Sequence, residues 1–193
     1  MRPKKALAGQ TTRTDSGELA AEVVGFWRAS EGRWFAKDKR FDAAFRERFL
    51  DLHLAVSARR YDRWMERPED ALALLILTDQ FPRNAFRGTG HMYATDPLAR
   101  FYARQALALG HMKRVEAALR LFFCLPFSHS EDEADQDIAV TLNGQLGQPW
   151  LEHAEGHRDI IRRFGRFPHR NPVLGRETTP EEVAFLNAGG FKG

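Results

Sequence analysis

Large apolar residues recur along the first third of the chain at the spacing of α-helices. One set falls on a single helical face between residues 16 and 30: Leu19, Val23, Phe26 and Trp27. A second set keeps the same spacing between residues 38 and 57: Phe41, Phe45, Phe49, Leu52 and Val56. Because an α-helix turns once every ~3.6 residues, both sets predict amphipathic helices whose apolar faces lie in the core.

The next segment predicts the most buried helix. PEDALALLILTDQF (68–81) starts with a proline and two acidic residues, which suit the first turn of a helix, and is then apolar on nearly every side. Pro82 disfavours helical geometry in Phe81, so we expect this helix to end there.

Start and stop signals predict the remaining helices over about 96–109, 114–124, 130–145, 149–164 and 179–189. Two of these starts have the pattern of a capping box, at 128–131 and 179–182. No segment alternates between apolar and polar residues as a strand does. The pattern predicts an all-α fold of about eight helices in antiparallel pairs, arranged as a bundle or a helical array.

Length and composition favour one ordinary globular domain. The chain has 193 residues, of which 43% are hydrophobic and 28% charged. We expect a single all-helical domain over 16–190, after a polar, mobile segment over 1–15 that has little to bury. No apolar run reaches the ~20 residues of a transmembrane helix, and the N-terminus lacks the apolar stretch of a secretory signal. A cytoplasmic protein without a membrane partner is the expectation.

Several kinds of chemistry are not indicated. The net charge of +3 is mild and the basic residues are scattered, so nucleic acid is an unexpected partner. Cys124 lies among apolar residues and is expected to be a buried small side chain. His153 and His157 would share a helical face, but Glu155 points away and no third ligand is evident, so we predict no metal site. No phosphate loop or serine nucleophile motif identifies a cofactor or a reaction.

The most distinctive feature is a helix stop that occurs twice, as FPRN (81–84) and FPHRN (167–171). Arginine and asparagine can bond the free carbonyl groups at a helix end, so capping explains much of each motif. Asp79 and Gln80 precede the first stop in an otherwise apolar helix, where a buried carboxylate would need an arginine partner.

The turn His129-Ser130-Glu131 is a further candidate for a site. Capping does not require a histidine there, and histidine can donate or accept a proton near neutral pH. Five carboxylates lie between 131 and 137, and five arginines lie between 158 and 170. We expect these acidic and basic clusters to pair with each other.

These segments resemble the bacterial domain-of-unknown-function family 924. The resemblance is carried by VVGFW (23–27), WF (34–35), LTDQFPRN (77–84), FFCLPFSHSED (122–132) and FGRFPHRNPVLGRETTPEEVAFL (164–186). It spans about residues 20–190 and implies an all-α, tetratricopeptide-like fold. It implies no activity, because the family is named for having none assigned. Phe127-Ser128 departs from the family pattern, in which a more acidic residue precedes His-Ser-Glu.

Two functions remain open. In the first, the chain is a binding or scaffold module with a polar pocket or groove near the three motif turns, for a small molecule or a peptide. In the second, it is a small-molecule enzyme, hydrolytic or acid–base, that uses His129, Glu131, Asp79 and Arg83. An enclosed pocket requires the three turns to lie close together. The candidate ligand-binding residues are Asp79, Gln80, Arg83, Asn84, His129, Ser130, Glu131, Arg166, His169, Arg170 and Asn171.

Overall fold

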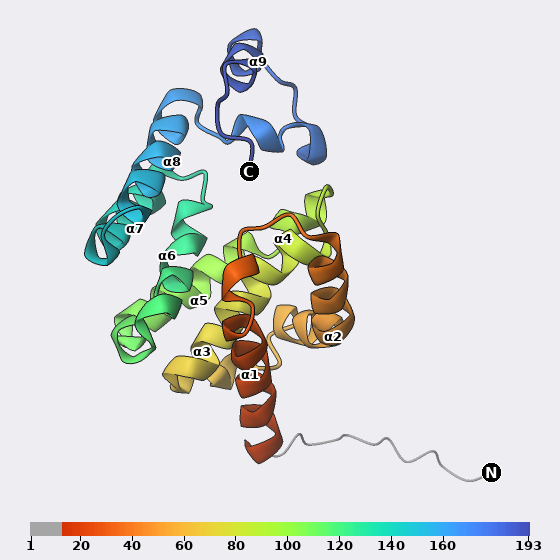
Figure 1. The fold of residues 1–193 in the computed structure, drawn as a ribbon. Helices are drawn as coiled ribbons and strands as arrows, with labels where there is room; N and C mark the ends of the chain where they lie inside the picture. The colour runs from red at the N-terminus through yellow and green to blue at the C-terminus, as the bar shows by residue number, and fades with distance from the viewer. Residues whose placement is uncertain (1–12) are drawn as a thin grey trace, which may run out of the picture.

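The computed structural model of the chain describes residues 13–193, and the regular elements in that range are helical (Figure 1). The α-helices are α1 (Arg13–Arg28), α2 (Lys39–Ser57), α3 (Pro68–Leu75), α4 (Phe81–Ala85), α5 (Asp96–Ala108), α6 (Leu121–Ser128), α7 (Glu133–Leu146), α8 (Trp150–Phe164) and α9 (Pro180–Asn187). The predicted all-α class is confirmed, whereas the tetratricopeptide-like arrangement stays a prediction. No helix within the described range is long and apolar enough to cross a membrane.

The N-terminal boundary differs from the expectation. Of the segment 1–15 that was predicted to be mobile, residues 1–12 lie outside the described part of the chain. The remaining three residues belong to α1, which therefore begins before the predicted domain start at residue 16.

Polar side chains fix the starts of two helices, one of them at the capping box predicted over 179–182. At the start of α2, Asp38 accepts hydrogen bonds from the backbone N–H groups of Arg40 at 2.9 Å and Phe41 at 3.2 Å. Thr179 and Glu182 form the predicted capping box of α9. Each cap satisfies N–H groups that have no partner within the helix.

The capping box predicted at 128–131 is wrong. Ser128 is the last residue of α6, because this helix continues past Pro126 instead of stopping there. The next helix, α7, begins at Glu133. Asp132 caps it by accepting hydrogen bonds from two backbone N–H groups of its first turn. The residues between these helices, 129–132, are therefore free to make tertiary contacts.

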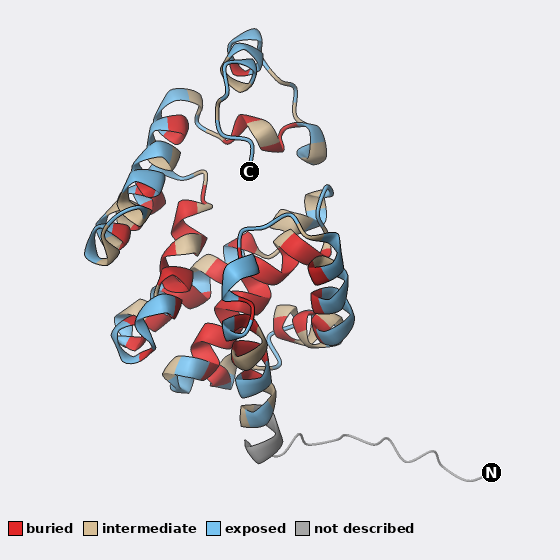
Figure 2. Cartoon of the chain, in the orientation of Figure 1, coloured by how far each residue is buried: buried red, intermediate tan, exposed pale blue. Residues whose placement is uncertain are grey.

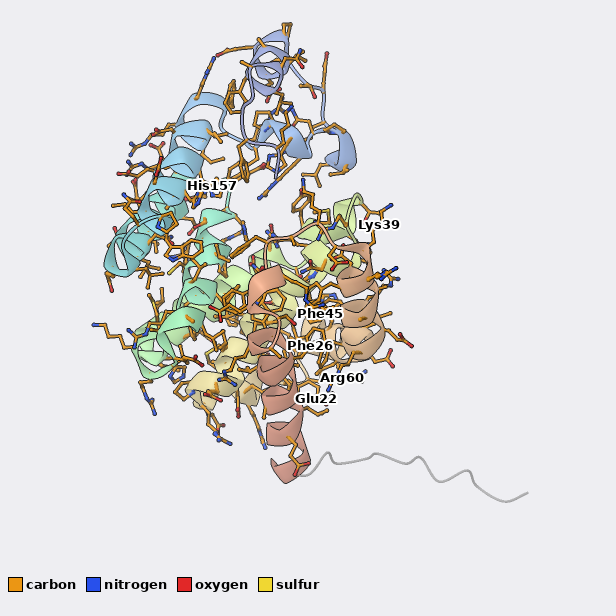
Figure 3. All side chains as sticks on the ribbon, viewed as in Figure 1. Glu22, Phe26, Lys39, Phe45, Arg60 and His157 are labelled. Atoms are coloured by element: carbon orange, nitrogen blue, oxygen red, sulfur yellow. The ribbon has the colours of Figure 1, made fainter. Side chains whose placement is uncertain are left out.

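The main core is rich in aromatic rings. α1 and α2 face each other through Phe26 and Phe45, whose ring centroids lie 5.3 Å apart (Figure 3). Trp27 meets Phe122 edge-on with centroids also 5.3 Å apart, which connects α1 to α6. α3 is buried from its third residue onward, as predicted, because apolar side chains cover nearly all of its sides (Figure 2). These helices form the frame that carries the first motif turn.

The central helix does not end at Phe81 as predicted, because a wider turn lets the chain continue past Pro82. Residues Ile76–Gln80 form a π-helical turn, and α4 follows directly. Pro82 has no N–H to offer the carbonyl of Thr78, four residues earlier. The hydroxyl of Thr95 donates to that carbonyl at 2.6 Å. The backbone is thus satisfied by a side chain from a distant loop, and such π-turns are frequent at functional sites.

The C-terminal third of the chain packs beside α6. α7 and α8 lie against each other (Figure 1). Across this pair, Arg162 lies 2.9 Å from Glu133 and 3.1 Å from Asp137, so the predicted pairing of the acidic and basic clusters is confirmed for this arginine. A small second core forms around the following turn from Ile160, Ile161 and Phe167, with Phe164 and Phe185 against it. This core holds the second motif turn opposite α4.

Candidate functional site

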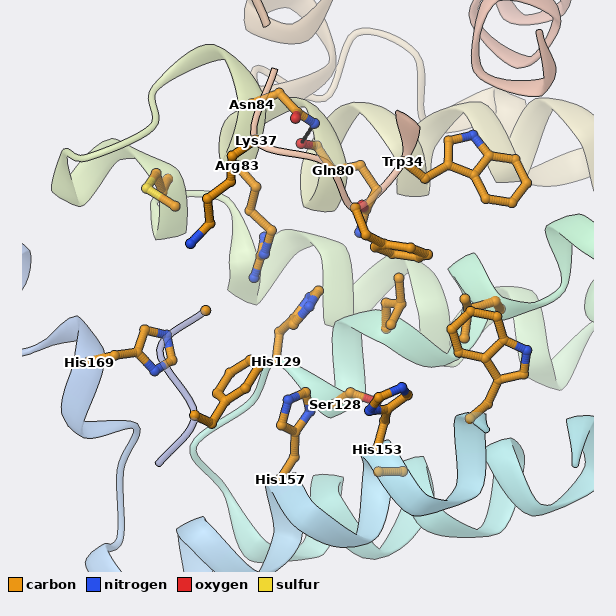
Figure 4. Close-up of a pocket in the computed structure, with 18 of the residues that line it drawn as sticks. Trp34, Lys37, Gln80, Arg83, Asn84, Ser128, His129, His153, His157 and His169 are labelled. Carbon is orange, nitrogen blue, oxygen red and sulfur yellow. Dashed lines mark hydrogen bonds between the residues drawn. The ribbon is translucent and has the colours of Figure 1, made fainter. Parts of the chain in front are cut away.

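A cavity of about 550 Å³ lies between α4, α6, α8 and the C-terminal segment (Figure 4). The three motif turns, which are far apart in sequence, meet at this cavity. Six of the predicted site residues line it: Gln80, Arg83, Asn84, His129, His169 and Arg170. The enclosed-pocket hypothesis required this convergence, whereas three unrelated helix ends would not have to face one another.

Asp79 lies behind the cavity wall and joins the first two turns. Its side chain is only 2% exposed. Its Oδ1 accepts a hydrogen bond from His129 Nδ1 at 2.8 Å, and its Oδ2 accepts one from Gln80 Nε2 at 2.5 Å. The Nη1 of Arg83 is 3.3 Å from Oδ1. A buried carboxylate needs such partners, and here both oxygens have them.

The pKa values of Asp79 and His129 determine which of them carries the proton. Burial alone would raise the pKa of Asp79, but the charge of Arg83 and the interaction with His129 outweigh burial and lower this pKa to about 2. Burial and the charge of Arg83 lower the pKa of His129, and Asp79 opposes them only in part. At neutral pH Asp79 is therefore ionised and His129 neutral. Since an ionised carboxylate can only accept, the imidazole proton is on Nδ1, and Nε2 is left as an acceptor.

Arg83 is closely paired with carboxylate and carbonyl oxygens. Its two terminal nitrogens donate to the two oxygens of Asp96 at 3.0 and 3.1 Å, which is a bidentate pair. Its Nη1 also donates to the backbone carbonyl of Asp79 at 2.5 Å. Because Asp96 is the first residue of α5, these bonds connect the first motif turn to that helix.

Arg170, from the second stop, is compensated less well. It is 6% exposed, and the closest carboxylate oxygen, Oδ2 of Asp96, is 3.9 Å from its Nη1. The ring centroids of Tyr93 and Phe167 lie 4.5 and 4.4 Å from its guanidinium carbon. Its Nε is buried and has no hydrogen-bond partner among the described residues. Burial and the charge of Arg83 lower the pKa of Arg170.

Two further histidines of the wall are neutral near pH 7. Burial, together with His129 and Arg170, lowers the pKa of His157 to about 3. Burial and the charge of Arg170 lower the pKa of His169 to about 4. Neutral imidazoles can donate or accept hydrogen bonds to a ligand. Within the described chain, no group of three or more His, Cys, Asp or Glu side chains is arranged to hold a metal ion.

Apolar side chains form the other end of the cavity. Figure 4 shows Trp34 on the opposite side from His169, with His129 and Ser128 between them. Phe35 and Trp150 contact each other at this end, with ring centroids 5.9 Å apart. The remaining apolar lining includes Leu121 and Leu125 of α6. The cavity therefore has a basic, polar end and an apolar, aromatic end.

Sequence comparison assigns the family. The sequence profile of a bacterial protein family of unknown function, DUF924, matches residues 23–190. The chain belongs to this family. A solved structure of a protein of unknown function from Agrobacterium tumefaciens is similar, with 57% sequence identity and a TM-score of 0.89 over 91% of this chain and 100% of that one. No curated protein matches the sequence. The predicted resemblance is confirmed, and membership of DUF924 brings no activity with it.

Four of the predicted residues in this DUF924 chain hold the motif turns in place without lining the cavity: Ser130, Glu131, Arg166 and Asn171. Glu131 accepts from Arg176 at 2.6 and 3.0 Å and from the backbone N–H of Phe167 at 2.8 Å. Ser130 donates to Asp135 at 2.7 Å. These bonds connect the turn after α6 to the second stop and to α7.

The second stop is held by a glutamate of α9. Arg166 donates to the two carboxylate oxygens of Glu182 at 2.6 and 2.9 Å. Asn171 donates to the same carboxylate at 3.1 Å. Both residues therefore hold the turn around Arg170, although Oδ1 of Asn171 is itself buried without a hydrogen-bond partner among the described residues. Arg170 is the charged side chain of this stop that combines burial with incomplete pairing.

Several lining residues were not predicted as part of a site. His157 was considered only as a metal ligand with His153, and its helical face carries it into the cavity instead. Lys37 lies in the irregular segment before α2, and Tyr93 ends a short 3-10 helix (Gly90–Tyr93). Trp150 lies at the start of a predicted helix and was not singled out. A count of polar and aromatic residues on the inner face of α8 could have indicated His157, but no local signal indicates Lys37.

Proposed function

We propose that this DUF924 chain binds a small organic molecule in the cavity between α4, α6 and α8. The main support is the convergence of polar side chains from three distant turns on one space. Capping of helix ends accounts for polar residues at each turn, but it gives no reason for them to face one another. The volume of about 550 Å³ falls within the range of ~300–1,000 Å³ typical of small-molecule sites.

The lining has the composition of a ligand site. Small-molecule pockets are mostly apolar and contain a few polar groups that fix the orientation of the ligand. Here Trp34, Trp150 and Leu125 offer apolar surface, while Gln80 and His129 offer polar atoms. A peptide or partner helix would instead need an extended apolar groove with contacts at helical spacing. The lining residues surround one compact space, which favours a small molecule over a peptide.

A ligand screen with a blocked cavity tests the proposal. Ala154 is 2% exposed and lines the cavity from α8, so Ala154→Phe places a ring in the space that a ligand would occupy. Compounds from a metabolite library that bind the folded chain should raise its melting temperature. We expect these shifts to disappear in Ala154→Phe and to persist in Ala43→Phe, a matched change at an exposed position of α2.

Circular dichroism first establishes that both variants fold. Compounds that stabilise Ala154→Phe as much as the parent chain bind elsewhere, and that result contradicts the proposal. A library in which no compound raises the melting temperature of the parent chain also counts against it.

Acid–base catalysis on the bound molecule is a second candidate function. The supporting observation is the 2.8 Å hydrogen bond between His129 Nδ1 and Asp79 Oδ1. This bond fixes the ring and leaves Nε2 unprotonated, on a side chain that lines the cavity and is 18% exposed. A neutral imidazole oriented in this way can act as a general base toward water or a ligand hydroxyl. Glu131, which is engaged by Arg176, has no direct part in this version, and Arg83 acts by holding Asp79.

A turnover assay distinguishes acid–base catalysis from ligand binding alone. Compounds that stabilise the chain are incubated with it and analysed for chemical change. General-base catalysis contributes about 100-fold or more to a rate, so His129→Gln should lower turnover by at least that factor while ligand affinity changes little. Turnover by His129→Gln at the parent rate would reject His129 as the base, and the proposal of ligand binding would stand.

A further inference from the structure

The cavity is lined by cationic side chains and, within the described residues, by no aspartate or glutamate side chain. The four cations are Lys37, Arg83, Arg87 and Arg170. Arg83 and Arg87 already have bidentate carboxylate partners, Asp96 and Asp42. Lys37 is exposed and forms no ion pair with another described residue. The least compensated positive charges of the lining are thus those of Lys37 and Arg170.

Arg170 is a fixed cation with hydrogen-bond donors to spare. A guanidinium has five N–H donors, and burying it without acceptors costs free energy. Its carboxylate neighbour, Asp96 Oδ2, is 3.9 Å away and already accepts from Arg83 at 3.1 Å. Contacts of 4.5 and 4.4 Å with the rings of Tyr93 and Phe167 hold the group in place. A rigid, buried and incompletely paired guanidinium is suited to hold an oxyanion.

We propose that the ligand of this cavity is an organic anion whose carboxylate or phosphate group binds Arg170 and whose apolar part lies toward Trp34. This proposal rests on the proposed function, because it requires that the cavity binds a small molecule. Both oxyanions share the chemistry that a guanidinium recognises, namely two oxygens placed for parallel N–H donors.

The electrostatics of the basic end support this assignment. Figure 4 shows Lys37, Arg83 and His169 together at this end of the cavity. Burial is the main reason why the pKa of His169 falls to about 4; the charges of Arg170 and Lys37 contribute, and the carboxylate of Glu131 opposes them. Four cationic side chains line the cavity and no carboxylate side chain among the described residues does, an arrangement that favours an anion. Neutral His169 can still donate a hydrogen bond to the same oxyanion.

The aromatic end fits an apolar group attached to the anion. Trp34 lies across the cavity from His169, and Trp150 lies near His153 with ring centroids 6.2 Å apart. An inorganic anion would leave this apolar surface unused. An organic anion can place its charge at Arg170 and bury its apolar part against the rings, which adds favourable transfer free energy.

Matched probes that differ in charge test the proposal. We would measure the affinities of 2-naphthoate and of 2-naphthamide, which has the same shape without the charge, by calorimetry at pH 7 and low salt. We expect naphthoate to bind at least tenfold more tightly than naphthamide, equivalent to about 1.4 kcal/mol. 2-Naphthyl phosphate and 2-naphthol form the second pair. The pair with the larger preference for its charged member shows whether the site binds a carboxylate or a phosphate better. Inorganic phosphate should bind more weakly than either aryl anion.

Variants of the two least compensated cations locate the anion. Arg170→Gln should reduce the preference for naphthoate to threefold or less, and Arg170→Lys should retain part of it, because lysine keeps the charge without the bidentate fork. Lys37→Gln is at an exposed position and keeps the test valid if the buried variants fail to fold. We expect it to lower the preference at least twofold. Arg163→Gln, whose side chain pairs with Glu181 away from the cavity, is the matched control and should leave the preference unchanged.

The outcomes separate the two proposals. Equal binding of naphthoate and naphthamide to the parent chain overturns the anion assignment and leaves small-molecule binding intact. An unchanged preference in both Arg170→Gln and Lys37→Gln overturns it as well. If no naphthalene probe binds at any charge while the metabolite library also gives no ligand, the proposed function itself fails.

Discussion

Replacement of Asp79 by asparagine tests whether the buried cluster behind the cavity stabilises the fold. The substitution keeps the size of the side chain and removes its charge. In the parent chain Oδ1 accepts from His129 at 2.8 Å, and Oδ2 accepts from Gln80 at 2.5 Å. The new NH2 group faces His129 or Gln80, which must then move its proton or turn its amide in order to accept from it. The variant also loses the negative charge beside Arg83, which keeps Asp96 as its remaining carboxylate partner.

The expected loss of unfolding free energy in Asp79→Asn can be estimated in two ways. Removal of one partner from a buried ion pair costs ~3–5 kcal/mol, and the retained pair of Arg83 with Asp96 places this case near the lower limit. Independently, the pKa of Asp79 is lowered from 3.8 to about 2, which corresponds to about 2 kcal/mol in favour of the folded, ionised state. Both routes give about 2–3 kcal/mol at pH 7.

The same pKa difference determines how the stabilisation by Asp79 depends on pH. Because the folded pKa of Asp79 lies below the unfolded value of 3.8, this stabilisation is fully present above that value. It is lost as the pH falls through about 2, where the folded carboxyl also takes up a proton. The difference in unfolding free energy between the parent chain and Asp79→Asn that comes from the Asp79 charge should therefore shrink as the pH falls from about 4 toward 2.

Urea unfolding followed by circular dichroism at pH 7, 5, 4 and 3 measures this difference. Asp132→Asn is the matched control, since asparagine caps a helix as well as aspartate, and it should change the unfolding free energy by no more than about 0.5 kcal/mol. An Asp79→Asn variant within about 0.5 kcal/mol of the parent chain at pH 7 would refute the stabilising role of the cluster. A difference that stays constant down to pH 3 would refute the role of the Asp79 charge.

Two further predictions concern the backbone turn and the wall of the cavity. Thr95→Val removes the hydroxyl that donates to the carbonyl of Thr78 and should cost about 1–2 kcal/mol in urea unfolding, whereas Thr95→Ser should restore most of it. A valine variant as stable as the parent chain would mean that water replaces the hydroxyl. In histidine NMR spectra, His157 and His169 should remain neutral at pH 6 and titrate near pH 3 and 4, because both are buried beside Arg170. Titration of either ring near pH 6.5 would contradict that environment.

The helices were predictable from sequence because their signals are local. The periodic apolar residues of α2 need only the helical repeat, and Asp38 or Thr179 needs only the N–H groups of the adjoining turn. The continuation of the central helix past Pro82 could not be predicted in this way. It depends on a hydroxyl at Thr95, which comes from a loop that the sequence pattern does not place near Thr78.

Site residues could be predicted from sequence only where a polar side chain stands among residues that are expected to be buried. Asp79 and Gln80 were noticed because polar residues in a buried helix need partners, and the structure supplies them. Glu131 was given a possible catalytic part because of its place in the His129-Ser130-Glu131 turn, and its carboxylate pairs with Arg176. Lys37 gives no such signal, because an exposed lysine in a loop is ordinary until a cavity forms beside it.

The two helix stops, alike in sequence, differ in how completely their arginines are paired. Arg83 has bidentate contact with Asp96 and a further bond to the chain, so its burial is explained by the fold alone. Arg170 is buried to a similar degree, yet its closest carboxylate oxygen is 3.9 Å away and is shared with Arg83. An incompletely paired buried cation lowers stability, and the proposed anionic ligand would supply acceptors that Arg170 lacks. The repeated motif thus brings two arginines to one carboxylate, Asp96, which pairs closely with Arg83 and only loosely with Arg170.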